Sequence, residues 1–267
     1  MLVNFVPVQL PELLGDRFAQ EFRYREYHPT GLADVAYCVW TVTVGETVEP
    51  AVNIILPDGC VDIVVDLSKG TADFAAFSKA TEEFEISGPS AQIGVRMKPG
   101  VFHALFGVPA SEVMDTTIPF ADLECETALD GVLGEGTPMP VRVAGLANYL
   151  VRKSTKLTPS AVMQELPRIY SNSLCRVDDI AGYLGYGVRQ VSRLFLDEIG
   201  VTPRVFLNIV RLHRSLHLLT EDPDNTLAGL AIEAGFFDQS HFVREIKRHT
   251  GVSPLEIRRR MISGSKA

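Results

Sequence analysis

Short apolar segments separated by Gly and Pro dominate the first 120 residues. AYCVWTVTV (36–44) is rich in β-branched and aromatic residues, and VDIVVD (61–66) alternates apolar residues with aspartate. Such alternation is typical of half-buried strands. Regularly spaced short strands favour a sandwich or a barrel. We therefore predict a β-rich domain over residues 1–120.

The spacing of apolar residues becomes helical after about residue 120. VAGLANYLVRK (143–153) has the pattern of an amphipathic helix, and TPSAVMQELPRIY (158–170) offers Thr158 as an N-cap with a proline in the first turn. GEGTPMPV (134–141) has the composition of a linker. We expect residues 121–172 to form a helical linker or dimerisation region rather than part of a ligand site.

An internal repeat distinguishes the C-terminal part of the chain. IAGYLGYGVRQVSRLFLDEIGVTP (180–203) and LAIEAGFFDQSHFVREIKRHTGVSP (230–254) align with one inserted residue. The matched pairs are Ala181/Ala231, Gly185/Gly235, Tyr186/Phe236, Arg193/Arg244, Gly200/Gly251 and Pro203/Pro254. Each copy has the pattern of a short helix, a glycine turn and a second helix, and residues 204–222 between them predict one long amphipathic helix. Residues 173–267 are therefore predicted to be an all-α domain of two helix-turn-helix units, although tandem helical hairpins also occur as scaffolds.

The second helix of each unit carries the candidate DNA-binding residues, because that helix enters the major groove with its N-terminal residues toward the bases. In the second unit we expect Asp238 to cap the helix and Phe242 and Ile246 to face the core. The exposed face then carries Gln239, Ser240, Val243 and Arg244. An amide, a hydroxyl and a guanidinium group suit adenine, phosphate and guanine, respectively.

The first unit repeats this layout. Gly187 takes the cap position, and Val191 and Phe195 are expected in the core. The exposed positions are Arg189, Gln190, Ser192 and Arg193. A merely solvated helix face is the alternative for either helix alone, and the repetition of the layout argues against it.

Two clusters have the residue types of other chemistries. Asp238, Ser240 and His241 could compose a hydrolase triad, but residues two apart on a helix point about 200° from each other, and no G-x-S-x-G turn surrounds the serine. His213 and His217 have the i, i+4 spacing of a zinc pair without the glutamate of H-E-x-x-H or a third ligand nearby. We therefore predict no catalytic residue, no metal and no cofactor.

Composition and charge narrow the function classes further. With 267 residues, 46% hydrophobic and 22% charged, the chain has the size of about two globular domains. The N-terminus lacks a signal-peptide pattern, no run of about 18 apolar residues occurs, and the four cysteines are widely separated, so we expect a cytoplasmic protein with no membrane partner. The formal charge is −8, yet residues 173–267 have 13 Lys and Arg against 11 Asp and Glu, a balance of +2. The acidity therefore belongs to the N-terminal part, and local charge decides phosphate binding.

Residues 173–262 resemble the DNA-binding domain of the AraC/XylS family of bacterial transcription regulators. AGFFDQSHFVREIKRHTGVSPLEIRR matches the family signature along its length, and VDDIAGYLGYGVRQVSRLFLDEIGVTP matches it less closely. The resemblance implies two recognition helices in successive major grooves, about 34 Å apart. The base-facing positions that it implies are Arg189, Ser192, Arg193, Gln239, Ser240 and Arg244, with Gln190 and His241 as backbone or flanking contacts. Gly187 and Arg176 depart from the usual capping residues, and Ile246 replaces a usual phenylalanine.

The N-terminal region resembles a domain found ahead of such DNA-binding halves, through LPDGCVDIVV (56–65) and GVRMKPGVFHALFGVPASEVMD (94–115). In this family that domain commonly senses a small molecule or dimerises, often through a cupin-like β fold. Three residues are candidates for effector binding, each weighed against a structural role: Trp40, the only tryptophan; Arg96, a lone cation beside apolar strands; and His103, in a short apolar helix. A metal-binding cupin is not expected, because residues 1–120 contain only two histidines.

The leading hypothesis is a cytoplasmic transcription regulator that binds a specific site in double-stranded DNA. We expect a small-molecule effector at its N-terminal domain and a homodimer, and an activator of this kind would also contact RNA polymerase. The alternative is a small-molecule-binding protein or an enzyme whose helical tail is a scaffold. A nonspecific nucleoid or RNA-binding protein is a third hypothesis, disfavoured by the small charge excess of the C-terminal part.

Overall fold

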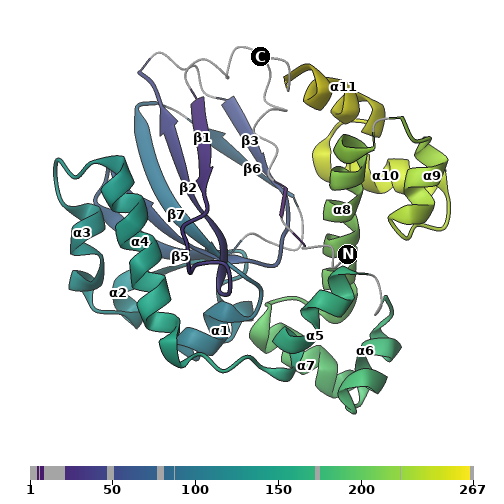
Figure 1. Ribbon diagram of the computed structural model, residues 1–267, viewed down its shortest axis with the longest axis horizontal. Coiled ribbons are helices and arrows are strands. Elements are labelled where there is room, and N and C mark those ends of the chain that lie inside the picture. The colour runs from purple at the N-terminus through teal and green to yellow at the C-terminus, as the bar shows by residue number, and fades with distance from the viewer. Residues whose placement is uncertain are drawn as a thin grey trace.

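The computed structural model describes residues 5, 7–8, 22–46, 51–76, 81–86, 88–171, 175–222 and 224–264. Most of the N-terminal segment inspected for a targeting pattern lies outside the described residues. Figure 1 shows a β-rich half beside a chain of helices, with the long helix α8 (Pro203–Glu221) between two helical groups. The prediction of a β-rich domain followed by an all-α domain is confirmed.

The N-terminal half contains two antiparallel sheets. The larger sheet has the strand order β1-β2-β7-β4-β5-β8, and β3 pairs with β6 in the smaller one. The strands are β1 (Phe22–Tyr27), β2 (Ala36–Val44), β3 (Ala51–Ile55), β4 (Val61–Asp66), β5 (Thr71–Ala76), β6 (Glu82–Ile86), β7 (Ser90–Met97) and β8 (Thr117–Pro119). Val61, Ile63 and Val65 alternate along β4 and are buried in the main hydrophobic core. The period-two pattern therefore places one face of the sheet in that core.

Short helices and two longer ones follow the strands. They are α1 (Val101–Phe106), η2 (Ala110–Glu112), α2 (Phe120–Leu123), η3 (Glu126–Leu129), α3 (Asp130–Leu133), α4 (Met139–Lys153), η4 (Ser154–Lys156) and α5 (Ala161–Tyr170). Helix α4 packs against β2 and β7, whereas α5 packs against α7 and α8. The predicted cap of α5 at Thr158 is wrong: Ser160 is the N-cap, and its hydroxyl accepts a hydrogen bond from the Met163 N–H at 3.1 Å. The predicted linker 134–141 also ends inside α4.

The C-terminal half contains the two predicted helix-turn-helix units. The first has α6 (Val177–Leu184) and α7 (Val188–Glu198), and the second has α9 (Leu227–Glu233) and α10 (Gln239–Thr250), followed by α11 (Pro254–Gly264). Gly185 and Gly235 make the equivalent turns at φ +70° and +86°, a conformation that costs glycine little. Helix α8 joins the units and contributes to the cores of both. The sequence repeat is thus a structural repeat.

The two halves pack together along α8. Leu56, from the loop before β4, is fully buried in the core of the second helix-turn-helix unit. His213 on α8 is also fully buried. Its Nδ1 accepts a hydrogen bond from the Val8 N–H at 3.0 Å, and its Nε2–H donates to the Pro57 carbonyl at 2.8 Å. Both histidine nitrogens therefore bond backbone groups of the N-terminal half.

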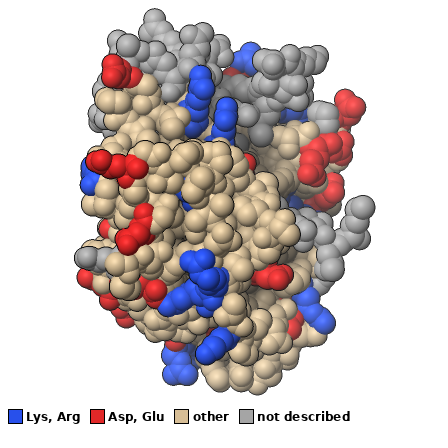
Figure 2. Space-filling model, turned by 60° about the vertical axis from the view of Figure 1, so that its left-hand side comes forward, with Lys and Arg blue, Asp and Glu red and all other residues tan. Residues whose placement is uncertain are grey.

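Charged side chains are mixed on the face that Figure 2 shows. Lys and Arg occur there in small groups, interspersed with Asp and Glu among a larger uncharged surface. This face therefore does not offer a broad area of positive potential to a polyanion.

Candidate nucleic-acid interface

Helix α10 of the second unit begins with a capped first turn. Asp238 is the N-cap residue, and its Oδ1 accepts a hydrogen bond from the His241 N–H at 2.7 Å. Phe242 and Ile246 are fully buried, so they fix the rotation of the helix. The exposed side carries Gln239, Ser240 and Arg244, with Val243 and His241 half-buried beside them. This unit therefore presents an amide, a hydroxyl and a guanidinium group from the N-terminal half of one helix.

Helix α7 of the first unit turns the equivalent side toward the core, but its N-terminus has no side-chain cap. Val191 and Phe195 are fully buried. Arg189, Gln190 and Arg193 are exposed, and Ser192 is half-buried. Gly187 is the N-cap residue and Arg176 is that of α6, and neither helix has a side-chain cap bond. The backbone N–H groups at both helix starts are therefore left without a side-chain acceptor at the cap position.

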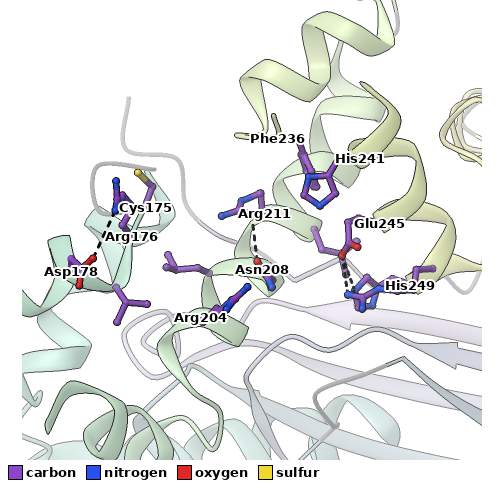
Figure 3. Close-up of a pocket in the computed structure, with 14 residues that line it drawn as sticks. Cys175, Arg176, Asp178, Arg204, Asn208, Arg211, Phe236, His241, Glu245 and His249 are labelled. Atoms are coloured by element: carbon purple, nitrogen blue, oxygen red, sulfur yellow. Dashed lines mark hydrogen bonds and ion pairs between the residues drawn. The ribbon is translucent and has the colours of Figure 1, made fainter. Parts of the chain in front are cut away.

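A groove of about 620 Å³ separates the two units. Figure 3 shows its walls: the start of α6, one face of α8 and the side of α10 next to its exposed face. Four arginines line it, namely Arg176, Arg204, Arg211 and Arg248. Sequence reasoning did not find Arg204 and Arg211 as site residues. The available signal was the spacing of Arg204, Asn208 and Arg211 in the first half of an amphipathic helix, which places the three on one face.

The cluster Asp238, Ser240 and His241 has no triad geometry. The Asp238 carboxylate bonds the backbone N–H of His241, and the His241 ring lies edge-on to Phe236 with their centroids 5.2 Å apart. His213 uses both nitrogens on backbone groups of the N-terminal half. Within the described residues, no group of three or more His, Cys, Asp and Glu side chains could hold a metal ion. No helix there is long and apolar enough to cross a membrane.

Two of the three effector candidates meet in a buried charge cluster. The Trp40 Nε1–H donates to Asp62 Oδ2 at 2.7 Å, and Arg96 Nη2 donates to the same oxygen at 3.3 Å. Arg96 also pairs with Asp58 at 3.3 Å, so the expectation of a lone cation is wrong. Gly94 leaves the space that the Trp40 ring fills, because a Cβ at residue 94 would lie 2.3 Å from that ring.

Burial dominates the electrostatics of this cluster. It raises the pKa of Asp62 to about 6, and the neighbouring Arg96 guanidinium opposes the rise. Asp62 Oδ1 has no hydrogen-bond partner among the described residues. The third candidate, His103, lies elsewhere: its Nδ1 is 3.1 Å from the Val108 carbonyl oxygen beside α1. The structure therefore joins Trp40 and Arg96 through Asp62 and leaves His103 apart.

A second hollow, of about 920 Å³, lies between the β-rich half and α5. Apolar side chains form much of its wall, including Leu32, Val101 and Leu166. Lys98 enters it with its ammonium 5.5 Å from the centroid of the Tyr37 ring, and partial burial lowers the pKa of that ammonium. None of the three predicted effector residues lines this hollow.

Comparison with known families defines the class of the C-terminal domain. A family model described as a helix-turn-helix domain matches residues 180–260. One described as a domain of unknown function (DUF6597) matches residues 25–119. The C-terminal domain is therefore a helix-turn-helix domain, similar to those of transcriptional regulators, in agreement with the resemblance to the AraC/XylS family.

Curated relatives match mainly through this domain. The transcriptional regulator MtrA of Neisseria gonorrhoeae is 31% identical over 83 residues, which are 31% of this chain and 27% of that protein. The transcriptional activator RhaS of Klebsiella pneumoniae is 32% identical over 118 residues, which are 44% of this chain and 41% of that protein. The chain thus aligns with less than half the length of both relatives.

Solved structures of two similar proteins differ in how much of the chain they match. A transcriptional regulator with an AraC-type DNA-binding domain from Chromobacterium violaceum is 25% identical, with 37% of this chain and 95% of that chain covered and a TM-score of 0.32. ToxT from Vibrio cholerae O395, bound to (E)-4-(8-methylnaphthalen-1-yl)but-3-enoic acid, is 13% identical, with 90% and 99% covered and a TM-score of 0.42. Neither TM-score supports conclusions about how the parts of this chain are arranged.

Proposed function

We propose that the chain is a sequence-specific DNA-binding transcription regulator, without catalytic activity, that acts on DNA in the cytoplasm. The observation that carries the proposal is the repeated recognition helix. Arg193 and Arg244 occupy matched positions on α7 and α10, and both side chains are exposed on helices whose opposite faces are buried. An exposed guanidinium in the N-terminal half of such a helix can reach guanine O6 and N7 in the major groove. The relatives named as transcriptional regulators or activators support the same function.

The base-reading set is proposed from the exposed positions of the two helices and the half-buried Ser192. It consists of Arg189, Ser192, Arg193, Gln239, Ser240 and Arg244. Gln190 and His241 are proposed to contact the DNA backbone or flanking positions. Asp238 holds the first turn of α10 in place. Wide nonspecific binding is disfavoured, because the C-terminal part has a charge balance of only +2.

A small-molecule effector is proposed to act at the N-terminal domain. Trp40 and Arg96 both already donate hydrogen bonds to Asp62, so an effector that used them would have to replace those hydrogen bonds. The hollow beside Lys98 is already open, although the Lys98 ammonium itself donates to the Ala33 carbonyl. Its volume of about 920 Å³ and its place at a domain boundary are typical of small-molecule sites. We also propose that the protein forms a homodimer and, if it activates transcription, contacts RNA polymerase.

Selection of bound sequences from a random duplex pool tests the function. We expect one motif with two half-sites about one helical turn apart. The selection is repeated with a metabolite mixture, and again with Lys98→Gln, which should lose any metabolite response while keeping the motif. A folded wild-type chain that enriches no motif would refute the proposal.

Substitution of single arginines tests the base-reading set. Arg244→Ala, and separately Arg193→Ala, should cost about 1–3 kcal/mol on the selected duplex and relax the preference at particular base positions. Arg152→Ala, on the exposed side of α4, provides the control. Equal weakening on every duplex would instead assign these arginines to the backbone.

A further inference from the structure

The groove between the two helix-turn-helix units has a row of arginines outside the proposed base-reading set. Arg204, Asn208 and Arg211 lie at i, i+4 and i+7 on α8, so they share one face of that helix. Arg176 enters from the start of α6 (Figure 3), and Arg248 on α10 also lines the groove. Three separate elements of the DNA-binding half thus direct guanidinium groups to one groove.

This face of α8 is the one left open to a large partner. Arg204 and Asn208 are exposed, whereas Leu212, His213 and Leu216 are buried. The side that carries His213 is covered by the loop containing Pro57. The groove therefore leaves this face of α8 accessible to a duplex.

Of the four groove arginines, Arg176 and Arg248 lie near carboxylates, whereas Arg204 and Arg211 do not form ion pairs with any described residue. Arg248 pairs with Glu245 at 2.8 Å, and Arg176 lies 3.8 Å from Asp178. Among the described residues, no carboxylate forms an ion pair with Arg204 or Arg211. The groove therefore has an excess of positive charge.

Arg211 also has two contacts within the protein. Its Nη1 donates to Asn208 Oδ1 at 3.4 Å, and its guanidinium carbon lies 5.8 Å from the centroid of the Phe236 ring. A cation over an aromatic ring loses less side-chain freedom when it then binds an anion. Phe236 belongs to the turn before α10, so the position of Arg211 is tied to the second unit.

We propose that Arg204 and Arg211 bind the phosphate backbone that lies between the two major grooves entered by α7 and α10. The inference rests on the proposed DNA-binding function and adds a contact surface to it. Two units that read successive grooves are about one helical turn apart, so the intervening backbone must pass the helix that joins them. Guanidinium groups bind phosphate through paired N–H donors. Such contacts set the register of the protein on DNA and carry no base information.

The groove is continuous with the proposed base-reading face, which favours DNA over a separate anion. His241 lines the groove and lies in the first turn of α10, directly after Gln239 and Ser240. Arg248, two turns further along α10, lines the same wall. A duplex seated on that first turn therefore brings its backbone to the groove.

The salt dependence of binding tests the proposal. Full-length wild type, Arg204→Gln, Arg211→Gln and the double variant are titrated with the selected duplex over a salt series. Each lost phosphate contact should reduce the slope of log Kobs against log salt by about 0.9, so the double variant should lose about twice that. The selected motif should stay the same. Arg152→Gln removes the same charge from exposed α4 and should leave the slope unchanged.

Neutral methylphosphonates provide a second measurement, whose main readout is on the wild type. Single methylphosphonates are placed along the duplex, and those between the two half-sites should weaken wild-type binding but leave the double variant unaffected. A double variant with the wild-type slope, or a wild type indifferent to those methylphosphonates, would overturn the proposal while the DNA-binding function stands. Failure of the wild type to select any duplex would instead reject the function itself. Thermal melting by circular dichroism checks folding, and if a variant does not fold, the wild-type methylphosphonate scan decides.

Discussion

Replacing His213 with phenylalanine should lower the free energy of unfolding, because it removes hydrogen bonds that join the two halves of the molecule. The substitution keeps an aromatic ring near Phe5, whose centroid lies 5.4 Å from that of His213. It removes both hydrogen bonds of the imidazole, and the buried Pro57 carbonyl loses its donor. A buried polar group left unpaired costs about 1–3 kcal/mol. The Val8 N–H is only partly buried and regains water, so we expect a total loss of about 2–4 kcal/mol at pH 7.

The pH dependence of that loss provides an independent signature. The pKa of His213 is lowered to about 4, chiefly by burial; the Pro57 carbonyl and Asp58 oppose the shift, and His217 and Arg96 add to it. A histidine in the unfolded chain titrates near 6.5, so the unfolded state binds more protons between about pH 6.5 and 4. Wild-type stability should therefore fall as the pH falls through this window, by about 3 kcal/mol in total. His213→Phe should lack this dependence.

The buried Asp62 changes stability in the opposite direction. Its pKa is raised to about 6, so the folded state binds the extra proton and gains stability as the pH falls below 6. This contribution is present in wild type and variant and cancels in their difference. The difference in unfolding free energy between the two proteins, and not either value alone, therefore isolates His213.

Urea unfolding of both proteins at pH 7 and pH 5 measures these quantities. Fluorescence of the only tryptophan, buried Trp40, follows the N-terminal half, and far-ultraviolet circular dichroism follows the helices. Coincident transitions would justify a two-state treatment. His28→Phe is the control, because His28 is exposed. A His213→Phe protein with the wild-type midpoint at pH 7 and the wild-type pH slope would refute the reasoning.

Three further substitutions test separate contacts. Asp238→Ala should cost about 1 kcal/mol by removing the cap of α10, with Asp238→Asn retaining most of it, measured by thermal unfolding; equal effects of the two would contradict the cap assignment. Gly59→Ala should cost about 1–3 kcal/mol in urea unfolding, because φ is +72° there and a Cβ would lie 2.8 Å from the Phe206 ring; an unchanged midpoint would show that the loop adapts. Arg96→Met should cost about 3–5 kcal/mol by leaving Asp58 and Asp62 buried without their cation, and a stable variant at pH 7 would argue against the cluster as a structural element.

The two halves of the molecule differ in their charge. The overall charge of −8 comes from the N-terminal part, while the exposed arginines of α7, α8 and α10 lie on the C-terminal part. If the protein binds DNA as proposed, the acidic N-terminal part disfavours DNA within about 10 Å of its own surface at moderate salt.

The sequence by itself determined the elements whose causes are local. The repeat, the turns at Gly185 and Gly235 and the Asp238 cap all follow from patterns within a few residues, and the structure has them where the sequence places them. The exposed face of α10 followed in the same way, since the 3.6-residue period fixes which side chains oppose Phe242. The cap of α5 was misplaced by two residues, because Thr158 and Ser160 are both good caps and only the packing of the chain selects one.

Only the tertiary structure decided the contacts between distant segments. Arg96 looked like a lone cation because Asp62, its partner, is 34 residues away in the chain and becomes its neighbour only when β4 pairs with β7. His213 resembled half of a zinc pair until the fold brought the Pro57 carbonyl, 156 residues away, to its Nε2. Arg204 and Arg211 could not be recognised as groove residues from the sequence, because the groove forms only where α6 and α10 lie beside α8. Periodicity shows which face of an element is polar, but packing alone determines what that face meets.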